Sequence, residues 1–197
     1  MTEKVILASA SPRRAELLRQ LGLSFDVLPV DVDEAPHQGE APADYVHRLA
    51  REKALAGYQR QGRADALVLG SDTTVVLDDH ILGKPADASD AGALLHRLSG
   101  RRHQVMTGIA LASASGVEAR VSVTEVRFRN LDQREIDAYC ATGEPMDKAG
   151  GYGIQGRGGA FVTGIRGSYS AVVGLPLDIT ASLLADAGLP VWDYWNS

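Results

Sequence analysis

The sequence predicts a mixed α/β fold, and two observations lead to this expectation. Short apolar runs with the length of buried strands alternate along the chain with segments of helical periodicity. Two long hairpin patterns, over residues 73–85 and 104–128, add antiparallel strand pairs to this alternation. The length of 197 residues fits either one large domain or two tightly joined lobes.

Local signals set the expected order of the elements. A helix opens at Ser11-Pro12, because serine suits the N-cap and proline suits the first helical position. A second helix over 42–58 is amphipathic. Its candidates for the buried side are Val46, Leu49, Ala50 and Leu55. Three further helices are expected, from Asp87 or Ser89 to Ser99, over 132–141 and over 177–187. The expected strands are Val5–Ala8, Phe25–Pro29, Ala66–Leu69, a hairpin turning at Asp78–His80, Gln104–Ala112, Val117–Phe128 and 168–174.

Composition and charge exclude several classes of protein. With 45% hydrophobic and 23% charged residues, the chain does not resemble a disordered protein. Its net charge of −5 argues against a nucleic-acid partner. The single Cys140 allows no internal disulfide, and no apolar run approaches the length of a membrane span. We therefore expect a cytoplasmic protein with no nucleic-acid partner and no membrane partner.

Glycine is concentrated in one segment. Nine of the 21 glycines fall within residues 143–167, among Tyr, Phe, Ile, Asp and Lys side chains that a flexible linker normally lacks. We expect an ordered loop whose backbone approaches another group closely or adopts positive φ angles. The sequence leaves open whether this loop is a rigid wall or a moving lid.

Two arginines break the usual charge preference at the start of the first helix. Arg13 and Arg14 occupy its second and third positions, where the helix dipole favours carboxylates. Free backbone N–H groups beside two guanidinium groups suit a phosphate or another polyanion. Two solvent-exposed arginines are the alternative, and the short approach from a buried strand favours anion binding.

Carboxylates follow two of the expected strands. Asp31, Asp33 and Glu34 come after one strand and Asp72 comes after another, at the carboxyl ends where ligands of α/β sheets gather. Without matching His or Cys residues, they suggest a hard cation such as Mg²⁺ that bridges phosphate oxygens. The alternatives are a solvated acidic turn for the first three and a turn or N-cap role for Asp72.

Two lysines complete this chemistry. Lys84 lies on a loop held by Gly83 and Pro85 and could reach a phosphate, whereas Lys53 lies on a helix, where a surface position is the ordinary expectation. The GxxxxGK[ST] pattern of a P-loop does not occur. The residues alone therefore point to a phosphoester substrate and a divalent cation, without identifying the phosphoester.

Several motifs together resemble the Maf family of nucleotide pyrophosphatases. They are LASASPRRAELL, DVDE, REKA, GSDTTVVLDDHILGKP, TGEP and DKAGGYGIQG, in family order from about residue 5 to residue 187. The resemblance implies a single domain over 1–197, with an elongated mixed sheet and two lobes around a central cleft, similar to inosine-triphosphate pyrophosphatases. It also implies hydrolysis of a nucleoside triphosphate to the monophosphate and pyrophosphate with Mg²⁺ or Mn²⁺.

The resemblance assigns roles to matching positions. Asp72 is the proton acceptor for the attacking water, and Glu34 holds the metal together with Asp72. The phosphate-binding residues that it implies are Ser9, Arg13, Arg14, Lys53 and Lys84. Arg13, Thr73 and Gln155 match the branch that hydrolyses dTTP and UTP and removes modified pyrimidine triphosphates. A carboxamide such as that of Gln155 can both donate to and accept from the O4/N3–H edge of thymine or uracil.

Other readings stay open at this point. The same chemistry could act on 7-methyl-GTP or on a broad set of noncanonical nucleotides, or the chain could be a non-catalytic nucleotide-binding regulator of cell division. The family resemblance allows a homodimer, to which the apolar tail VWDYW could contribute. We favour the interpretation that Trp192 and Trp195 of this tail cover the core.

Overall fold

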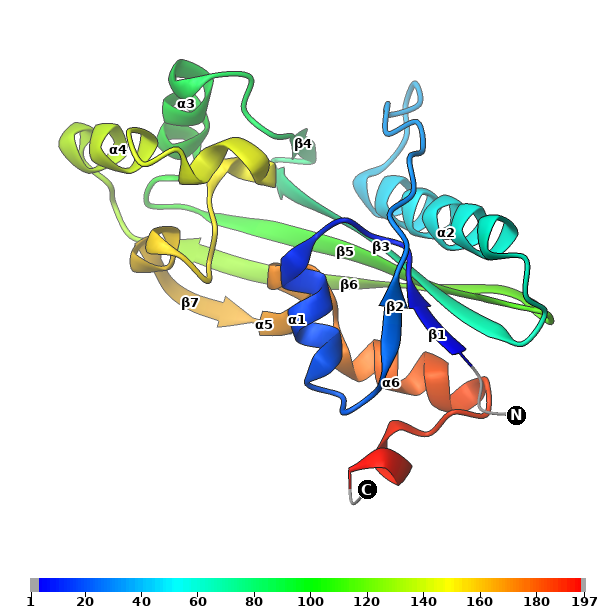
Figure 1. Cartoon of the computed structure of the whole chain (residues 1–197). Coiled ribbons are helices and arrows are strands. Elements are labelled where there is room, and N and C mark those ends of the chain that lie inside the picture. Colours follow the sequence, from blue (N-terminus) through cyan, green and yellow to red (C-terminus); the bar gives the residue numbers. More distant parts are fainter. Residues whose placement is uncertain (1–3, 196–197) are drawn as a thin grey trace. The chain divides into compact units, whose positions relative to one another are not determined.

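The computed structural model describes residues 4–195 of the chain (Figure 1). Residues 1–3 and 196–197, which the expected domain over 1–197 includes, lie outside the described part. The strands are β1 (Lys4–Leu7), β2 (Phe25–Val27), β3 (Ala66–Leu77), β4 (His80–Leu82), β5 (Arg102–Ser113), β6 (Gly116–Phe128) and β7 (Val162–Arg166). The α-helices are α1 (Pro12–Arg19), α2 (Pro42–Gln61), α3 (Ala88–Leu98), α4 (Gln133–Cys140), α5 (Tyr169–Val173) and α6 (Leu177–Asp186). Short 3₁₀ helices are η1 (Glu144–Asp147), η2 (Ala149–Gly151), η3 (Arg157–Phe161) and η4 (Val191–Tyr194).

The described strands form a mixed seven-stranded sheet, which confirms the predicted α/β class. Its order is β2-β1-β3-β5-β6-β7, with β4 paired to β3. β1 pairs in parallel with both β2 and β3, whereas the β3–β4 and β6–β7 pairs are antiparallel. The parallel part follows from the connections through α1 and α2, and the antiparallel part follows from hairpins.

The chain divides into two compact units, each with its own hydrophobic core. The first unit comprises Met1–Asp72, Thr107–Ser122 and Gly174–Ser197, and the second comprises Thr73–Met106 and Val123–Val173. In the first unit, small and branched residues of β1, β3 and β5 pack against Ala50 and Ala54 of α2. In the second, Phe128 lies among leucines of α3 and the rings of Tyr139, Tyr152 and Phe161.

Helix α2 lies unusually close to the strands of the first unit because two glycines face it. A Cβ atom at Gly70 of β3 would lie 2.4 Å from the carbonyl oxygen of Ala50 and from the amide nitrogen of Ala54. A Cβ at Gly108 of β5 would lie 2.1 Å from the carbonyl oxygen of Val46. These distances are far below van der Waals contact, so only glycine permits this approach.

Most of the expected elements are confirmed, and the helix caps explain several boundaries. Ser11 is the N-cap of α1 and its hydroxyl faces the amide of Arg14 at 3.5 Å. Asp87 caps α3, and Asp132 and Glu135 form a capping box at the start of α4. In α2, Val46, Leu49 and Ala50 are buried as expected.

Three expectations about local structure are wrong. Leu55 of α2 is 37% exposed, because the buried face of the helix passes through Ala54 and Gly57 instead. The strand expected over 168–174 is wrong, because Tyr169–Val173 form helix α5. The Ser168 hydroxyl caps this helix by accepting from the amide of Ala171 at 3.2 Å. The strand of this region is β7, which ends at Arg166.

The position of Asp72 in its strand is the third correction. The sequence suggested that a strand ends at Leu69 and that Asp72 follows it, whereas β3 continues without a break to Leu77. The hairpin then turns at Asp78 and Asp79, which have φ angles of 52° and 63°. Asp72 is therefore a strand residue with a fixed direction, and neither a turn nor an N-cap residue.

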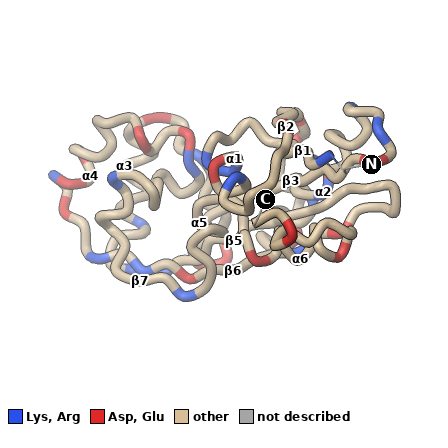
Figure 2. Tube along the Cα trace, turned by 60° about the horizontal axis from the view of Figure 1, so that its bottom comes forward, with Lys and Arg blue, Asp and Glu red and all other residues tan. Residues whose placement is uncertain are grey.

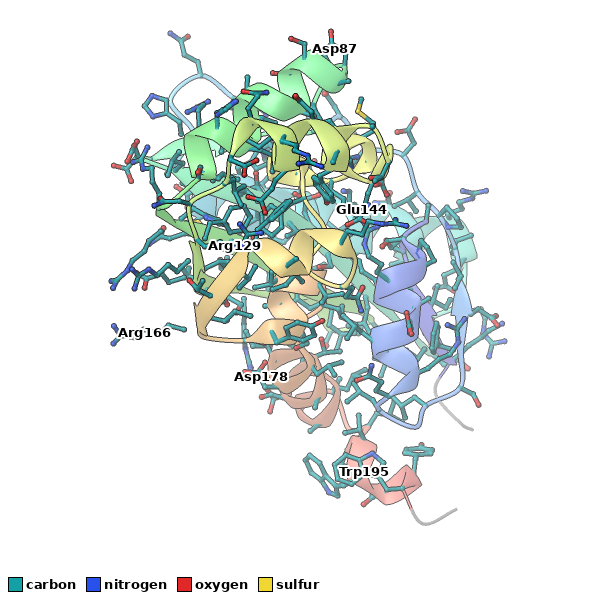
Figure 3. The ribbon with its side chains drawn as sticks, turned by 90° about the vertical axis from the view of Figure 1, so that its left-hand side faces the viewer. Asp87, Arg129, Glu144, Arg166, Asp178 and Trp195 are labelled. Atoms are coloured by element: carbon teal, nitrogen blue, oxygen red, sulfur yellow. The ribbon has the colours of Figure 1, made fainter. Side chains whose placement is uncertain are left out.

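The prediction that Trp192 and Trp195 of the C-terminal tail cover the core is wrong. Trp192 and Trp195 are 51% and 60% exposed, and Figure 3 labels Trp195 on this tail. Trp195 nevertheless lies over Gly22 after α1, and its indole N–H donates to the carbonyl of Leu21 at 3.0 Å. In the described part of the chain, no helix has both the length and the apolar character needed to span a membrane.

Candidate active site

Lys53 is the centre of the candidate site in the first unit. Its ammonium nitrogen lies 2.6 Å from Oε1 of Glu34 and 2.7 Å from Oδ1 of Asp72. Lys53 and Asp72 are each 8% exposed, whereas the Glu34 side chain is about half exposed. The expectation of a surface lysine at this helix position is therefore wrong, and Lys53 joins two carboxylates that are 38 residues apart in the sequence.

The close approach of α2 to β3 explains this contact. Side chains two residues apart on a strand point to the same face, so Asp72 points to the face on which Gly70 meets α2. Because Gly70 lets the helix backbone come close at Ala50 and Ala54, the neighbouring Lys53 can reach Asp72 with its side chain. The contact thus depends on a glycine two positions before the aspartate.

The loop that carries Glu34 is tied to the same helix. The Tyr45 hydroxyl donates to the carbonyl oxygen of Glu34 at 3.0 Å. The Arg48 guanidinium donates to both carboxylate oxygens of Glu40, at 2.6 and 2.8 Å, and to the carbonyl of Ala35 at 3.1 Å. The hydrogen bonds from Arg48 hold the pKa of Glu40 at about 2. Three side chains of α2, at positions 45, 48 and 53, therefore hold the acidic loop in place.

Sequence reasoning missed Tyr45, although a signal for it exists. Tyr45 and Lys53 are eight residues apart, a spacing that places both on one face of a helix. Burial raises the pKa of Tyr45 to about 12, and the charges of Asp72 and Glu34 act in the same direction. The phenol therefore stays protonated near neutral pH and donates its hydrogen bond to the loop.

The first helix presents the expected cationic group. The Arg14 side chain donates to the Ser9 hydroxyl at 3.3 Å and, through Nε, to the carbonyl of Gly174 at 2.8 Å. Burial lowers the pKa of Arg14, and the negative charges of Asp72 and Glu34 oppose this effect. Arg13 is half-buried, and its positive charge also acts on Arg14. The structure thus joins Ser9 to Arg14 and places Arg14 close enough to Asp72 and Glu34 for their charges to act on it, as the SPRR motif suggested.

Ser71 is a second residue that the sequence did not single out. Its side chain is fully buried, and its hydroxyl lies 2.8 Å from the carbonyl of Gly108 and 2.9 Å from that of Gly174. Because neighbours on a strand point to opposite faces, Ser71 anchors the face of β3 that Asp72 does not use. The carbonyl of Gly174 accepts from both Ser71 and Arg14, so it links the aspartate strand to the first helix.

Thr73, Lys84 and Gln155 belong to the second unit and are described within it. Thr73 is half-buried on β3, and Lys84 is exposed on the loop after β4. The carbonyl of Gly83 accepts from the amide of Gly150 at 3.0 Å, so the Lys84 loop is bound to the glycine-rich segment. Gln155 is exposed on that segment. Asp31 and Asp33 of the acidic turn are exposed, and Asp33 accepts from the amide of Ala35.

The donors of the first unit suit a hard divalent cation only in part. Glu34 and Asp72 each aim a carboxylate oxygen at one point, the Lys53 nitrogen. Within residues 4–195, no group of three or more His, Cys, Asp or Glu side chains could hold a metal by itself. Mg²⁺ is commonly bound by one or two carboxylates together with substrate phosphates and water. The pair therefore fits a cation whose remaining ligands are phosphate oxygens and water.

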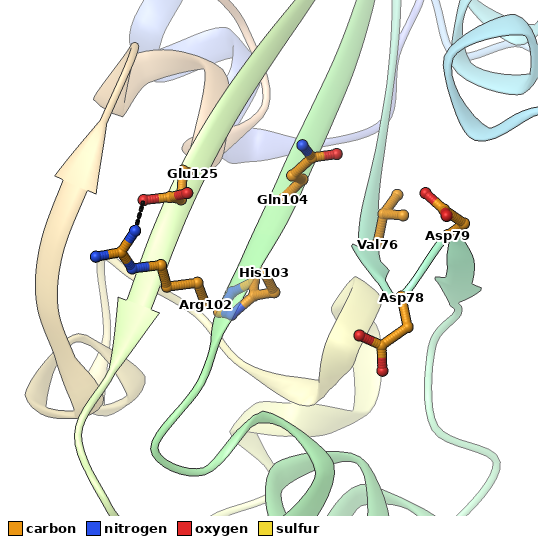
Figure 4. A pocket seen from close by; sticks show the side chains of 7 residues that line it. All are labelled: Val76, Asp78, Asp79, Arg102, His103, Gln104 and Glu125. Carbon is orange, nitrogen blue, oxygen red and sulfur yellow. Dashed lines mark ion pairs between the residues drawn. The ribbon is translucent and has the colours of Figure 1, made fainter.

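A cavity of about 230 Å³ lies in the second unit, and Figure 4 shows its lining. Arg102 and Glu125 form an ion pair at one side, 3.5 Å apart, and the acidic hairpin turn lies at the other. None of the site residues expected from the sequence lines it. The residues that do so are Val76, Asp78, Asp79, Arg102, His103, Gln104 and Glu125.

Comparison with known families agrees with the motif pattern. The family model described as "Maf-like protein" matches residues 4–187, which is most of the chain. The chain belongs to this family. The contacts of Lys53 join the REKA motif to Glu34 of the DVDE motif and to Asp72 of the GSD motif. Ser9 and Arg14, which also contact each other, both belong to the LASASPRRAELL motif.

Several Maf-like relatives share more than half of their residues with this chain. A protein of Aromatoleum aromaticum is 54% identical over 95% of this chain and 97% of its own length. One of Shewanella sp. is 56% identical, covering 94% and 98%, and one of Anaeromyxobacter dehalogenans is 55% identical, covering 98% and 99%. Each of these relatives is named dTTP/UTP pyrophosphatase. A solved dITP/XTP pyrophosphatase of Mycobacterium abscessus aligns with a TM-score of 0.44 and 21% identity, over 65% of this chain and 75% of its own.

Proposed function

We propose that this Maf-like protein is a nucleoside triphosphate pyrophosphatase that hydrolyses dTTP and UTP to the monophosphate and pyrophosphate. The observation that carries the chemistry is the convergence of two carboxylates on the buried Lys53, beside the Arg14 guanidinium. The names of relatives that are more than half identical over nearly their full length support the choice of substrate. Removal of modified pyrimidine triphosphates is part of the same proposal.

In the proposed reaction, water attacks the α-phosphorus of the triphosphate. A bond forms between the water oxygen and this phosphorus, and the bond from the phosphorus to the bridging oxygen of the β-phosphate breaks. Asp72 accepts the proton of the attacking water, and pyrophosphate leaves with the bridging oxygen. Lys53 holds the Asp72 carboxylate in one orientation, so the base is positioned before the substrate arrives.

Cationic groups stabilise the charge that grows on the leaving pyrophosphate. Arg13, Arg14, Lys53 and Lys84 would bind phosphate oxygens. Ser9 orients Arg14 through its hydroxyl. Glu34 and Asp72 would hold Mg²⁺ or Mn²⁺ together with the phosphates. A bound divalent cation would neutralise phosphate oxygens and lower the pKa of a coordinated water.

Base preference is proposed to depend on Arg13, Thr73 and Gln155. The Gln155 carboxamide, held in one orientation, can donate to O4 and accept from N3–H of thymine or uracil, whereas cytosine presents the reverse arrangement of donor and acceptor. The substrate is a free nucleotide. Basic and acidic residues are interspersed along the trace in Figure 2, and we propose neither a nucleic-acid nor a membrane partner. A cytoplasmic location and a homodimer are also part of the proposal, and neither is needed for the chemistry.

A panel of nucleotides tests the proposed function. Pyrophosphate release is measured with Mg²⁺ or Mn²⁺ for dTTP, UTP, CTP, GTP and 7-methyl-GTP. We expect metal-dependent release that is fastest with dTTP and UTP. A maximum with another base would leave the chemistry in place and contradict the roles of Thr73 and Gln155. No release with any triphosphate would favour a nucleotide-binding regulator instead.

The variant Asp72→Asn separates binding from turnover. The amide keeps the shape of the side chain but is a much weaker proton acceptor, so we expect kcat to fall at least about 100-fold. Binding of dTTP, measured by calorimetry with Ca²⁺ present, should be retained. The variant Asp137→Asn, on an exposed turn of α4, serves as the control and should keep full activity. Full turnover by Asp72→Asn would contradict the assigned role.

A further inference from the structure

The glycine-rich segment of the second unit is built around one carboxylate. The Glu144 side chain is only 14% exposed and lies beside the ribbon of this segment (Figure 3). Its Oε1 accepts from the Tyr139 hydroxyl at 2.9 Å and from the amide of Gly158 at 3.1 Å. Its Oε2 accepts from the amide of Arg157 at 3.1 Å. Every one of these three groups is a donor, so the position requires a group that only accepts.

The glycines of the segment let its backbone pass close to this carboxylate. A Cβ at Gly156 would lie 2.4 Å from Oε1 and 2.7 Å from Oε2 of Glu144. A Cβ at Gly158 would lie 2.8 Å from the Tyr139 hydroxyl oxygen, and one at Gly153 would lie 2.6 Å from a side-chain carbon of Lys148. The concentration of glycine thus follows from wrapping a chain around buried side chains, and the segment is an ordered loop, as the sequence suggested.

Tyr139 closes the arrangement from the other side. Its hydroxyl donates to Glu144 and accepts from the amide of Gly153 at 3.1 Å. Burial raises the pKa of Tyr139, which keeps the phenol protonated and able to donate. Burial alone would also raise the pKa of Glu144, but the hydrogen bonds from Gly158, Arg157 and Tyr139 outweigh it and hold the pKa below its ordinary value.

Gln155 lies between the two anchored parts of this loop. The residues before it are held through Gly153, and those after it are held through Arg157 and Gly158. Two successive turns, from the amide of Gly156 to the carbonyl of Gly153 and from the amide of Gly159 to the carbonyl of Gly156, fix the backbone on both sides. Gln155 itself is exposed, so the hydrogen bonds of Glu144 and Tyr139 to this loop determine the position of the Gln155 backbone and thereby of its carboxamide.

We propose that Glu144 is a positioning residue that holds the Gln155 loop in the conformation that discriminates between bases. This inference rests on the proposed function, because it assigns Glu144 to the same recognition of thymine and uracil. Glu144 does not touch the nucleotide in this account. It acts by fixing the backbone amides of residues 153–158, and its replacement relaxes selectivity without removing any group that contacts phosphate or water.

The experiment is a double-mutant cycle on the ratio of kcat/KM for dTTP to that for CTP, whose base presents the reverse arrangement of donor and acceptor. It compares the wild type with Gln155→Ala, Glu144→Gln and the double variant. Glutamine has the size of glutamate, but its NH₂ group would face a backbone or hydroxyl donor. We expect each single change to lower the ratio about tenfold, mainly through KM for dTTP. The double variant should lower this ratio no further, because both substitutions remove the same base contact.

A matched control separates positioning from general loss of stability. Glu135 of the same unit also accepts hydrogen bonds, from Arg129 and from the amide of Asp132, but it lies at the start of α4. Glu135→Gln should lower the melting temperature and leave the base ratio unchanged. Should Glu144→Gln fail to fold, Tyr139→Phe removes one donor of the network and should lower the ratio in the same direction by a smaller factor.

The outcomes distinguish the inference from the function on which it rests. A wild type without pyrophosphate release or without a preference for dTTP and UTP over CTP would overturn the proposed function. A ratio unchanged by Gln155→Ala would overturn the role of Gln155 and this inference with it. A ratio lowered by Gln155→Ala but unchanged by Glu144→Gln and Tyr139→Phe would overturn the inference alone, as would fully additive effects in the double variant.

Discussion

At the scale of single residues, burial gives ordinary side chains fixed directions and fixed partners. Lys53 is the clearest case in the first unit, because a buried ammonium needs compensating charge and finds it in Glu34 and Asp72. His103 is the corresponding case in the second unit. It is 3% exposed, its Nε2 lies 2.8 Å from the Tyr152 hydroxyl oxygen, and its ring packs edge-on against Phe128.

The buried His103 predicts a specific dependence of stability on pH. Burial lowers the pKa of His103 from 6.5 to about 4 in the folded state. As the pH falls below 6.5, the unfolded chain takes up a proton that the folded chain does not, so the free energy of unfolding decreases. The loss continues down to about pH 4 and reaches about 3 kcal/mol at roughly 1.4 kcal/mol per unit of pKa difference.

Urea unfolding between pH 7.5 and 4 measures this contribution. Other groups also titrate in this range, so the relevant quantity is the difference in pH dependence between the wild type and His103→Gln. Glutamine can still form a hydrogen bond with Tyr152, but it carries no titrating ring. We expect the variant to lose about 2–3 kcal/mol less than the wild type over this range. Parallel curves for the two proteins would show that His103 is not held neutral by the fold.

At the scale of elements, the packing of α2 on the strands determines the site more than any side chain does. The Gly70→Ala variant would place a methyl group 2.4 Å from backbone atoms of Ala50 and Ala54, so helix and strand must separate. We expect a loss of about 3 kcal/mol in the free energy of unfolding. Because Lys53 would then move away from Asp72, we also expect kcat/KM for dTTP to fall about 100-fold.

Gly164→Ala is the matched control for this substitution. Gly164 lies on β7, its φ angle is not in the left-handed region, and a Cβ there would have no atom within 4 Å. We expect its stability to change by less than about 1 kcal/mol and its activity to stay the same. Equal effects of Gly70→Ala and Gly164→Ala, measured by urea unfolding and pyrophosphate release, would mean that the close approach of α2 is not required.

The sequence predicts the elements that depend on local signals and misses those that depend on tertiary contacts. Signals that act over a few residues succeed: the Ser11 cap, the helix that begins after Asp132 and the hairpin turn at Asp78–Asp79 are all found. The strand predicted over 168–174 is wrong. Valine favours strands, but the Ser168 hydroxyl accepts from the amide of Ala171 and so stabilises the start of a helix. The length of β3 was also missed, since Gly70 and Ser71 resemble a turn until their tertiary partners are known.

For the candidate site, the motifs identify most residues but not their relations. Motif matching names Glu34, Lys53 and Asp72, yet the helix pattern alone favours an exposed Lys53. Only the approach of two distant segments reveals that its ammonium joins the carboxylates. Glu144 belongs to the TGEP motif, but its role in the loop depends on donors that lie 5 to 14 residues away in the sequence.

At the scale of the whole molecule, the backbone connects the two units four times. Strands β3, β5 and β6 each begin in one unit and end in the other, and the fourth crossing follows α5. Each unit has its own buried cluster, so two independent transitions on unfolding are conceivable. Continuous strands argue against this, because unfolding one unit would leave half of each of three strands without its continuation.

We therefore predict a single cooperative unfolding transition, tested by one core substitution in each unit. Leu49→Ala in the first unit and Phe128→Ala in the second remove side chains that are 0% and 1% exposed. They should lower the free energy of unfolding by about 2–5 and 3–5 kcal/mol respectively. In differential scanning calorimetry, both should shift one transition whose calorimetric and van't Hoff enthalpies agree. If either variant splits the transition into two, the strands do not couple the units, and each core unfolds by itself.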